Sequence, residues 1–201
     1  MSPLFSRYTH TDVRRVIEEY PLAWVLSPGA PAPNATLLPM LGVFGDDGAL
    51  VGLFGHMSRA NPLHARLVAQ GVAQFLFTGP QGYVSPEHAG RRNWGPTWNY
   101  AAVRIEAEVR MDTALTEGAV KRLIAANEAG RARPWTADEL GERYRGMLGA
   151  IIGFEARVTA LDATFKLAQD EDDEVLGHLV EAHPDADLRA WMRRMNEDRL
   201  G

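Results

Sequence analysis

One segment of the sequence gathers a hydroxyl, a guanidinium and a side-chain amide within a few residues. It is GHMSRANP, residues 55–62, and the three groups belong to Ser58, Arg59 and Asn61. An apolar stretch ends here and a helix is expected to begin at Pro62, with Asn61 as its N-cap. Free N–H groups at a helix start, together with an arginine, favour binding of a phosphate monoester. The alternative is a simple helix cap with the other two residues on the surface, and the segment alone does not decide between them.

A second segment places two aromatic side chains on either side of an amide. In GPTWNY, residues 95–100, Trp98, Asn99 and Tyr100 stand at the start of a long predicted strand. Aromatic rings there could stack on a flat heterocycle, and the amide could hydrogen-bond to it. Aromatic residues at the rim of a barrel also occur in the hydrophobic core or in a subunit interface. Both interpretations, binding of a ligand and structural packing, therefore stay open.

The elements that must position these segments are short strands with interspersed helices. A helix is expected over residues 9–20, capped by Thr11, and further helices from Pro62 to Gly71, over 115–129 and over 136–148. Strands are expected over residues 23–26, 36–44, 49–55, 73–78, 83–85, 98–111, 151–161 and 165–167. Residues 27–33 and 86–97 are expected to be loops, and residues 79–82 a turn. Six or seven strands in this pattern favour a small decorated barrel over a βαβ sheet.

Composition narrows the class of protein. With 201 residues, 46% of them hydrophobic, the chain can bury the core of one ordinary domain. The absence of cysteine excludes disulfides, thiolate metal sites and cysteine nucleophiles. A formal net charge of −5 argues against a broad cationic surface that could bind nucleic acid. No apolar run approaches the roughly 20 residues of a membrane span, and the first ten residues do not resemble a secretory signal, so a cytoplasmic protein is expected.

Motifs of common catalytic sites are also missing. The sequence contains no G-x-S-x-G, no P-loop and no G-x-G-x-x-G after a strand. His178 and His183 are the closest pair of histidines, but their spacing does not place them on one helical face. No metal site is therefore expected, and catalytic residues are not assigned.

Together the two segments resemble the PaiB-like family of FMN-binding negative transcriptional regulators, part of the FMN-binding split-barrel superfamily. The resemblance covers most of residues 1–170. The matching stretches are, in the family's order, GHMSRANP (55–62), FTGPQGYVSP (77–86), PTWNY (96–100), IIGFEARV (151–158) and FKLAQ (165–169).

The resemblance implies a mainly β fold with flanking helices. The expected fold is an FMN-binding split β-barrel of six or seven antiparallel strands over residues 1–169, followed by a C-terminal helical extension over residues 170–201. The resemblance further implies a homodimer with FMN in the cleft between subunits. Its phosphate would lie around residues 56–61, and its isoalloxazine ring near Thr36–Pro39, with Trp98–Tyr100 close by. The residues that match the flavin site are Thr36, Leu38, His56, Met57, Ser58, Arg59, Asn61, Trp98, Asn99 and Tyr100.

Several positions depart from the family pattern. Leu37 and Arg104 stand where histidines are usual, His64 and His88 where aromatic residues are usual, and Asp170 where asparagine is usual. These changes keep two alternatives in view: an FMN-dependent oxidoreductase, in which the cofactor carries the chemistry, and a degenerate split barrel that no longer binds flavin. The sequence shows no helix-turn-helix pattern and no basic face, so direct DNA binding is not expected and any effect on transcription would be indirect.

Overall fold

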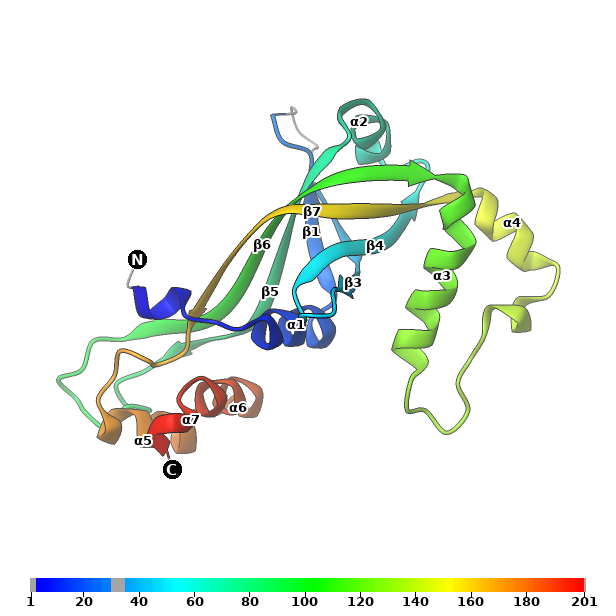
Figure 1. Ribbon diagram of the computed structural model, residues 1–201. Helices are drawn as coiled ribbons and strands as arrows, with labels where there is room; N and C mark the ends of the chain where they lie inside the picture. The colour runs from blue at the N-terminus through cyan, green and yellow to red at the C-terminus, as the bar shows by residue number, and fades with distance from the viewer. Residues whose placement is uncertain (1–2, 30–34, 201) are drawn as a thin grey trace.

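A single curled antiparallel sheet forms the centre of the molecule (Figure 1). The computed structural model describes residues 3–29 and 35–200, so most of the loop predicted over residues 27–33 lies outside the described residues. Within them the strands follow the spatial order β2-β1-β5-β6-β7-β4-β3. Their bounds are β1 (Leu22–Leu26), β2 (Ala35–Pro39), β3 (Leu41–Phe44), β4 (Leu50–Ser58), β5 (Val72–Val84), β6 (Thr97–Asp112) and β7 (Ile151–Lys166).

The two edge strands of this sheet are consecutive in the sequence. Only Met40, which is buried, separates the end of β2 from the start of β3. The sheet therefore curls until its two edges meet at this residue. Gly55 on β4 makes the close approach possible, since a Cβ there would lie 2.8 Å from the sulfur of Met40. This closure produces the split β-barrel that the resemblance implied, and the expected fold class is confirmed.

Alternation along the long strands separates the core from the outer face. On β6, Val103, Ile105 and Ala107 are buried, while Arg104 and Glu106 between them are exposed. Phenylalanines on β5 and β7 fill the same interior, and burying each side chain contributes about 1.5–3 kcal/mol. The pattern therefore fixes which side of each strand faces the core.

The turn predicted over residues 79–82 is wrong. These residues continue β5, and the pairing with β6 shifts between Thr78 and Gln81. A register shift accommodates Pro80, which has no N–H to give to the ladder. Strand β5 thereby stays paired with β6 as far as Val84, which pairs with Thr97.

Helix α1 (His10–Glu19) packs its apolar side against the sheet, with Val13, Val16 and Ile17 buried. Its N-cap is Thr9 rather than the predicted Thr11, because Thr9 forms a reciprocal capping box with Asp12. Helix α2 (Pro62–Gln70) is capped by Asn61 at its start and by Gly71 at its end, as the sequence predicted. A short 3-10 helix, η1 (Pro3–Ser6), precedes α1.

A helical arm stands between β6 and β7; its first helix packs against β7 and β4, and its last helix extends beyond the end of the sheet (Figure 1). It consists of α3 (Thr113–Glu128), the 3-10 helix η2 (Ala137–Leu140) and α4 (Arg143–Gly149). The helix predicted over residues 136–148 is thus divided in two. Gly141, with φ of 56°, separates the two pieces.

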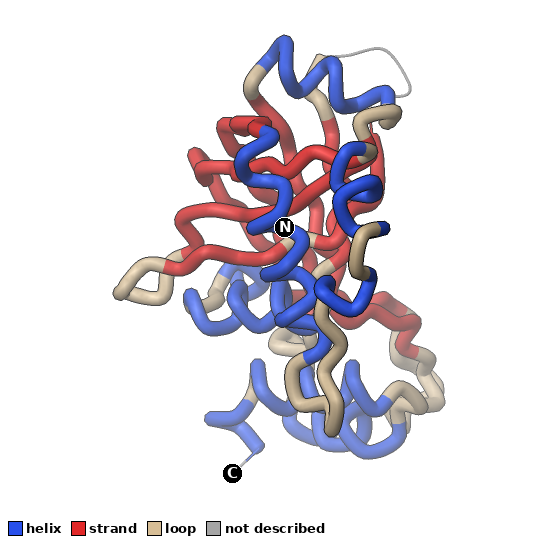
Figure 2. The backbone as a smooth tube through the Cα atoms, turned by 90° about the vertical axis from the view of Figure 1, so that its right-hand side faces the viewer, coloured by secondary structure: helices blue, strands red, loops and turns tan. Residues whose placement is uncertain are grey.

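The C-terminal residues form three helices, α5 (Asp173–Ala182), α6 (Ala186–Met195) and α7 (Glu197–Leu200), which lie beside one another below the sheet (Figure 2). Leu188 and Trp191 of α6 are buried. Arg194 of α6 donates through Nε to the buried carboxylate of Asp12 across 3.0 Å. The helical tail therefore packs against α1 and one end of the barrel.

Candidate functional site

The turn between β4 and α2 holds the first candidate segment. Asn61 accepts the N–H of Leu63 across 2.9 Å as the N-cap of α2, and its amide nitrogen donates to Thr36 Oγ1 across 3.0 Å. Thr36 lies on β2, so the asparagine ties this strand to the turn. Both polar groups of the Asn61 amide are occupied, which makes Asn61 a positioning residue for the segment.

Arg59 lies at the same turn and reaches the start of the helical arm. Its backbone N–H donates to the carbonyl of Ala150 across 2.9 Å, and its guanidinium donates to Thr113 Oγ1 across 3.0 Å. Among the described residues, no carboxylate pairs with the guanidinium. Thr113 is the first residue of the 16-residue helix α3, whose N-terminus carries partial positive charge. The N-cap of α3, Asp112, adds a negative charge, which is offset by Arg110 at 2.7 Å.

Ser58 ends β4 beside this guanidinium. Its hydroxyl oxygen accepts the N–H of Ala60 across 3.2 Å, which leaves the hydroxyl proton for another acceptor. His64 supports the turn from α2, with Nδ1 at 3.2 Å from the carbonyl oxygen of Arg59. One of the departures from the family pattern thus contributes to the local structure of the segment.

His56 contains a polar atom without a partner. Its Nδ1 is shielded from solvent and makes no hydrogen bond within the described part of the chain. Burial lowers the pKa of His56 from its ordinary value of 6.5. On the neighbouring strand β7 its partner is Gly153, whose N–H donates to Thr116 of α3 across 2.9 Å. His56 is therefore a neutral side chain next to the first turn of α3.

Three of the ten predicted site residues face the core. Leu38 and Met57 are buried among the apolar residues of the barrel, and Asn99, 2% exposed, donates to the sulfur of Met192 across 3.2 Å. Every second residue of β6 from Asn99 onward, including Ala101 and Val103, faces the core. This alternation in the sequence indicated that the Asn99 side chain would also face inward. Their side chains support the fold and are not available to an external ligand.

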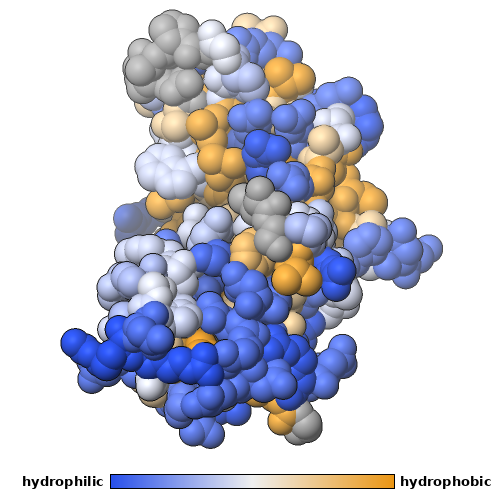
Figure 3. Space-filling view, turned by 90° about the vertical axis from the view of Figure 1, so that its left-hand side faces the viewer, coloured by the Kyte–Doolittle hydropathy of each residue, from blue (hydrophilic) through white to orange (hydrophobic). Residues whose placement is uncertain are grey.

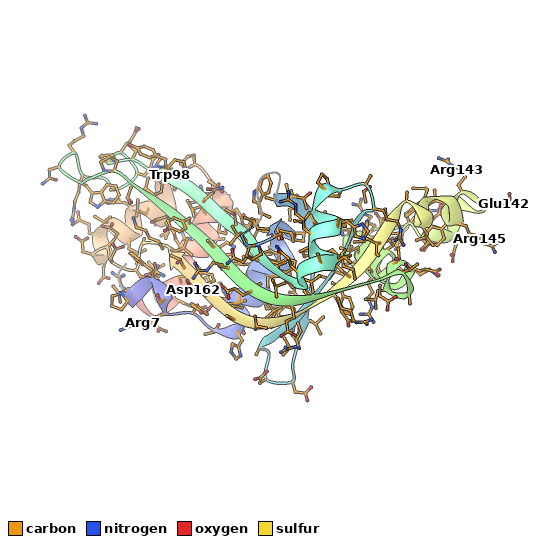
Figure 4. All side chains as sticks on the ribbon, turned by 90° about the horizontal axis from the view of Figure 1, so that it is seen from above. Arg7, Trp98, Glu142, Arg143, Arg145 and Asp162 are labelled. Atoms are coloured by element: carbon orange, nitrogen blue, oxygen red, sulfur yellow. The ribbon has the colours of Figure 1, made fainter. Side chains whose placement is uncertain are left out.

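The structure does not bring Trp98 and Tyr100 to the Arg59 segment within one chain. Trp98 lies near the start of β6, whereas Thr113 immediately follows its end. Figure 4 shows Trp98 at one end of the molecule and Arg143 and Arg145 of the arm at the other. Trp98 is 53% exposed and packs edge-on against Tyr83, a residue that the sequence reasoning missed, with ring centres 6.2 Å apart.

An exposed apolar strip crosses the outer face of the sheet. The register aligns Leu37 with Trp24 and Trp24 with Leu76, and Leu22 lies two residues before Trp24. Leu22, Trp24 and Leu37 are each about half exposed. Figure 3 shows apolar residues gathered in the upper half of the view, above a mostly hydrophilic lower half. We call Leu22, Trp24, Leu37 and Leu76 the outer apolar strip.

Comparison with known proteins decides the family. Residues 1–160 match the family described as "Putative FMN-binding domain". The chain belongs to this family. The match confirms the resemblance to PaiB-like proteins, and the ligand of the family, FMN, is the cofactor that the sequence predicted. None of the described helices is long and apolar enough to cross a membrane.

The chain is also similar to individual proteins, one by sequence and others by structure. The chain is 26% identical over 184 residues to "Protease synthase and sporulation protein PAI 2" of Bacillus subtilis, which covers 89% of this chain and 86% of that protein. Among solved structures, the FAD and heme binding protein from Mycobacterium smegmatis has a TM-score of 0.59 at 16% identity, covering 85% of this chain and 78% of that one. The flavocytochrome Anf3 from Azotobacter vinelandii has a TM-score of 0.55 at 18% identity, covering 80% and 69%. At 16% and 18% identity, the similarity to these two structures is evidence for the fold alone.

The side chains around Arg59 fit the phosphate end of FMN. A guanidinium that pairs with no carboxylate among the described residues, a hydroxyl with a free proton and a helix N-terminus are donors that suit phosphate oxygens. The exposed Trp98 and Tyr83 fit a flat ring system, but they belong to the other end of the sheet.

Proposed function

We propose that the protein is an FMN-binding split-barrel homodimer that holds the cofactor's phosphate at the turn between β4 and α2. The observation that supports this most is the position of Arg59, which donates to Thr113 at the start of α3 and has no carboxylate partner in the part of the chain that the structure describes. A charge-assisted bond to phosphate completes the hydrogen bonding of such a group. The sequence match to the FMN-binding family supports the choice of ligand.

The neighbours of Arg59 take supporting roles in this proposal. Ser58 donates its hydroxyl proton to a phosphate oxygen, while its own oxygen keeps the N–H of Ala60. Asn61 and Thr36 hold the turn in place through the bond between them. When bound, FMN supplies electron-transfer chemistry that no side chain of this chain provides. The protein's residues bind and orient the cofactor.

The second copy of the chain is proposed to cover the outer apolar strip. Contiguous exposed apolar surface on a folded domain marks an interaction site. Trp24, about half exposed in the middle of the strip, is aligned with Leu37 on one side and Leu76 on the other. In a two-fold dimer built on this face, Trp98 of the partner subunit would provide the flat surface that the Arg59 segment lacks within its own chain.

A regulatory role is proposed to act without direct DNA contact. Acidic residues outnumber basic ones by 26 to 21 in the whole chain. The barrel also presents Arg104, Arg110 and Arg157 in ion pairs with carboxylates of adjacent strands rather than as a free basic surface. DNA binding needs clustered cations that are free to meet phosphates.

Binding of FMN compared with riboflavin, which lacks the phosphate, tests the proposed site. We expect flavin fluorescence to be quenched saturably by the wild-type protein, with FMN bound more tightly than riboflavin. In Arg59→Ala the preference for FMN should fall strongly, because the charge-assisted bond to the phosphate is lost and only the weaker donors of Ser58 and the start of α3 remain. Arg143→Ala on α4, an exposed arginine at the end of the arm, is the matched control and should keep the preference. An unchanged preference in Arg59→Ala would show that the phosphate lies elsewhere.

A further inference from the structure

A cleft lies between helices α1 and α3, with strand β3 as its floor (Figure 1). Its volume is about 450 Å³. Each helix contributes one arginine to the lining, Arg14 from α1 and Arg122 from α3. The other side chains of the lining are apolar and belong to Leu41, Val43, Phe44 and Phe54. We call it the arginine cleft.

Aromatic rings hold both guanidinium groups in the arginine cleft. The Cζ atom of Arg14 lies over the ring of Phe44, 4.8 Å from its centre. That of Arg122 lies over the ring of Phe54, 4.6 Å from its centre. Gly42 makes room for the Phe44 ring on the floor, since a Cβ there would lie 2.6 Å from two of the ring carbons. A guanidinium held over a ring keeps N–H groups at its edge that can donate to a ligand.

The carboxylates near the arginine cleft leave most of these N–H groups without an acceptor. Arg14 pairs with Glu18 through Nε across 2.8 Å, so its two terminal nitrogens stay available. Asp47, at the hairpin end of the cleft, accepts the backbone N–H of Ala49 across 3.0 Å. Arg122 forms neither an ion pair nor a hydrogen bond within the described part of the chain. All five of its N–H donors can therefore bind an external anion.

We propose that the arginine cleft binds a small organic carboxylate with an apolar body. The carboxylate accepts hydrogen bonds from Arg122 and from the terminal nitrogens of Arg14, because the planar fork of a guanidinium matches the two oxygens of a carboxylate. The apolar body lies against Leu41 and Val43 on the floor. Burial of this body favours such a ligand over a bare inorganic anion.

The arginine cleft is separate from the turn that holds Arg59. Arg59 contacts Thr113, the first residue of α3, whereas Arg122 lies further along the same helix. At about 1.5 Å per residue, Thr113 and Arg122 are about 13 Å apart along the helix axis. None of the residues assigned to FMN belongs to the lining of the cleft. The carboxylate site therefore does not depend on flavin binding.

The probe is n-hexanoate, ionised at pH 7, compared with hexan-1-ol and protonated n-hexylamine of the same chain length. The measurement is a titration of the full-length protein labelled with ¹⁵N-phenylalanine, followed by the backbone amide signals of its seven phenylalanines. Phe44→Tyr and Phe54→Tyr identify the two signals from the cleft, and the remaining signals serve as internal controls. We expect hexanoate to shift the two cleft signals saturably, with hexan-1-ol binding about tenfold more weakly and hexylamine weaker still.

Substitutions of the two arginines test the charge. Arg122→Gln should weaken hexanoate binding about tenfold, whereas Arg145→Gln, the same change at an exposed arginine of α4, should leave it unchanged. Arg14→Gln, which removes the second cation, should also weaken hexanoate binding. In Arg122→Glu the order of the probes should be reversed, so that hexylamine binds more tightly than hexanoate.

Three results would each overturn the proposal: equal binding of the three probes, an unchanged affinity for hexanoate in Arg122→Gln, or no saturable shift of the two cleft signals. FMN binding is measured in parallel and should be unchanged in Arg122→Gln. Hexanoate binding should likewise be unchanged in Arg59→Ala, because that substitution leaves the arginine cleft intact. The two sets of measurements keep a failure of this proposal distinguishable from a failure of the proposed FMN site.

Discussion

Arg59 and Thr113 lie far apart in the sequence, yet the guanidinium of one donates to the hydroxyl of the other across 3.0 Å. Strand pairing brings them together, because Ser58 pairs with Ile151 on β7 and Asp112 of β6 pairs with Gly153 of the same strand. The positive charge of the Arg59 guanidinium and the partial positive charge at the N-terminus of α3 therefore lie next to each other. This relationship underlies the proposed position of the FMN phosphate.

Removing the Thr113 hydroxyl should weaken FMN binding moderately. In Thr113→Val the guanidinium of Arg59 loses the acceptor that fixes its orientation, and we expect a loss of about 0.5–1.5 kcal/mol in the free energy of FMN binding. Thr11→Val, at an exposed position of α1, is the matched control. Flavin fluorescence titration measures both. An unchanged affinity in Thr113→Val would mean that this contact does not orient Arg59 for the ligand.

A charge in the middle of the outer apolar strip should dissociate the proposed dimer. Trp24→Glu would bury an unpaired carboxylate in the interface, a change that a subunit contact does not tolerate. We expect a monomer in sedimentation velocity experiments. Val68→Glu, on the exposed side of α2 and outside the strip, should leave the dimer intact. A dimeric Trp24→Glu protein would assign the interface to another surface.

The C-terminal extension, residues 170–201, should unfold together with the barrel. Leu188 of α6 is fully buried, and its Cδ2 lies only 2.9 Å from where a Cβ on Gly82 of β5 would be. Leu188→Ala should lower the free energy of unfolding by about 2–5 kcal/mol while keeping a single transition, and Met147→Ala at an exposed position should change it little. Urea denaturation followed by circular dichroism provides the test. Two separate transitions would instead show that the extension is an independent unit.

Acid should destabilise the protein partly through His56. Its pKa is lowered in the folded state by burial, so the unfolded chain binds the proton more readily. The contribution of His56 is therefore present above pH 6.5, the ordinary pKa, and is lost as the pH falls from there toward the lowered value. In His56→Gln the free energy of unfolding should depend less on pH in this window, whereas His10→Gln, an exposed substitution, should retain the wild-type dependence. Identical pH profiles for wild type and His56→Gln would contradict a buried neutral histidine.

Local signals in the sequence were sufficient to predict many of the helices and strands. Asn61, Pro62 and Gly71 marked both ends of α2, since a cap, a first-turn proline and a left-handed glycine each have a local physical cause. The alternation on β6 likewise predicted a long strand. Helix α1 was also found, but its cap was misplaced because Thr9 and Thr11 are equally good cap residues by type, and only the bond to Asp12 distinguishes them.

Long-range relationships were not readable in the same way. The turn expected over residues 79–82 has turn residues, but pairing with β6 keeps it within β5. The contact between Arg59 and Thr113 depends on the pairing of β4, β7 and β6, and no local pattern encodes it. Leu38 and Met57 matched the family's site by position, yet strand alternation directs both into the core.

The most direct test of the central claim is the dissociation constant of FMN for the wild-type protein, Arg59→Ala and the control Arg143→Ala, measured by quenching of flavin fluorescence. We predict saturable binding to the wild type and to Arg143→Ala, and a loss of about 1.5–3 kcal/mol in Arg59→Ala, the size of a charge-assisted hydrogen bond. Equal dissociation constants for the three proteins would contradict the assignment of Arg59 to the FMN phosphate.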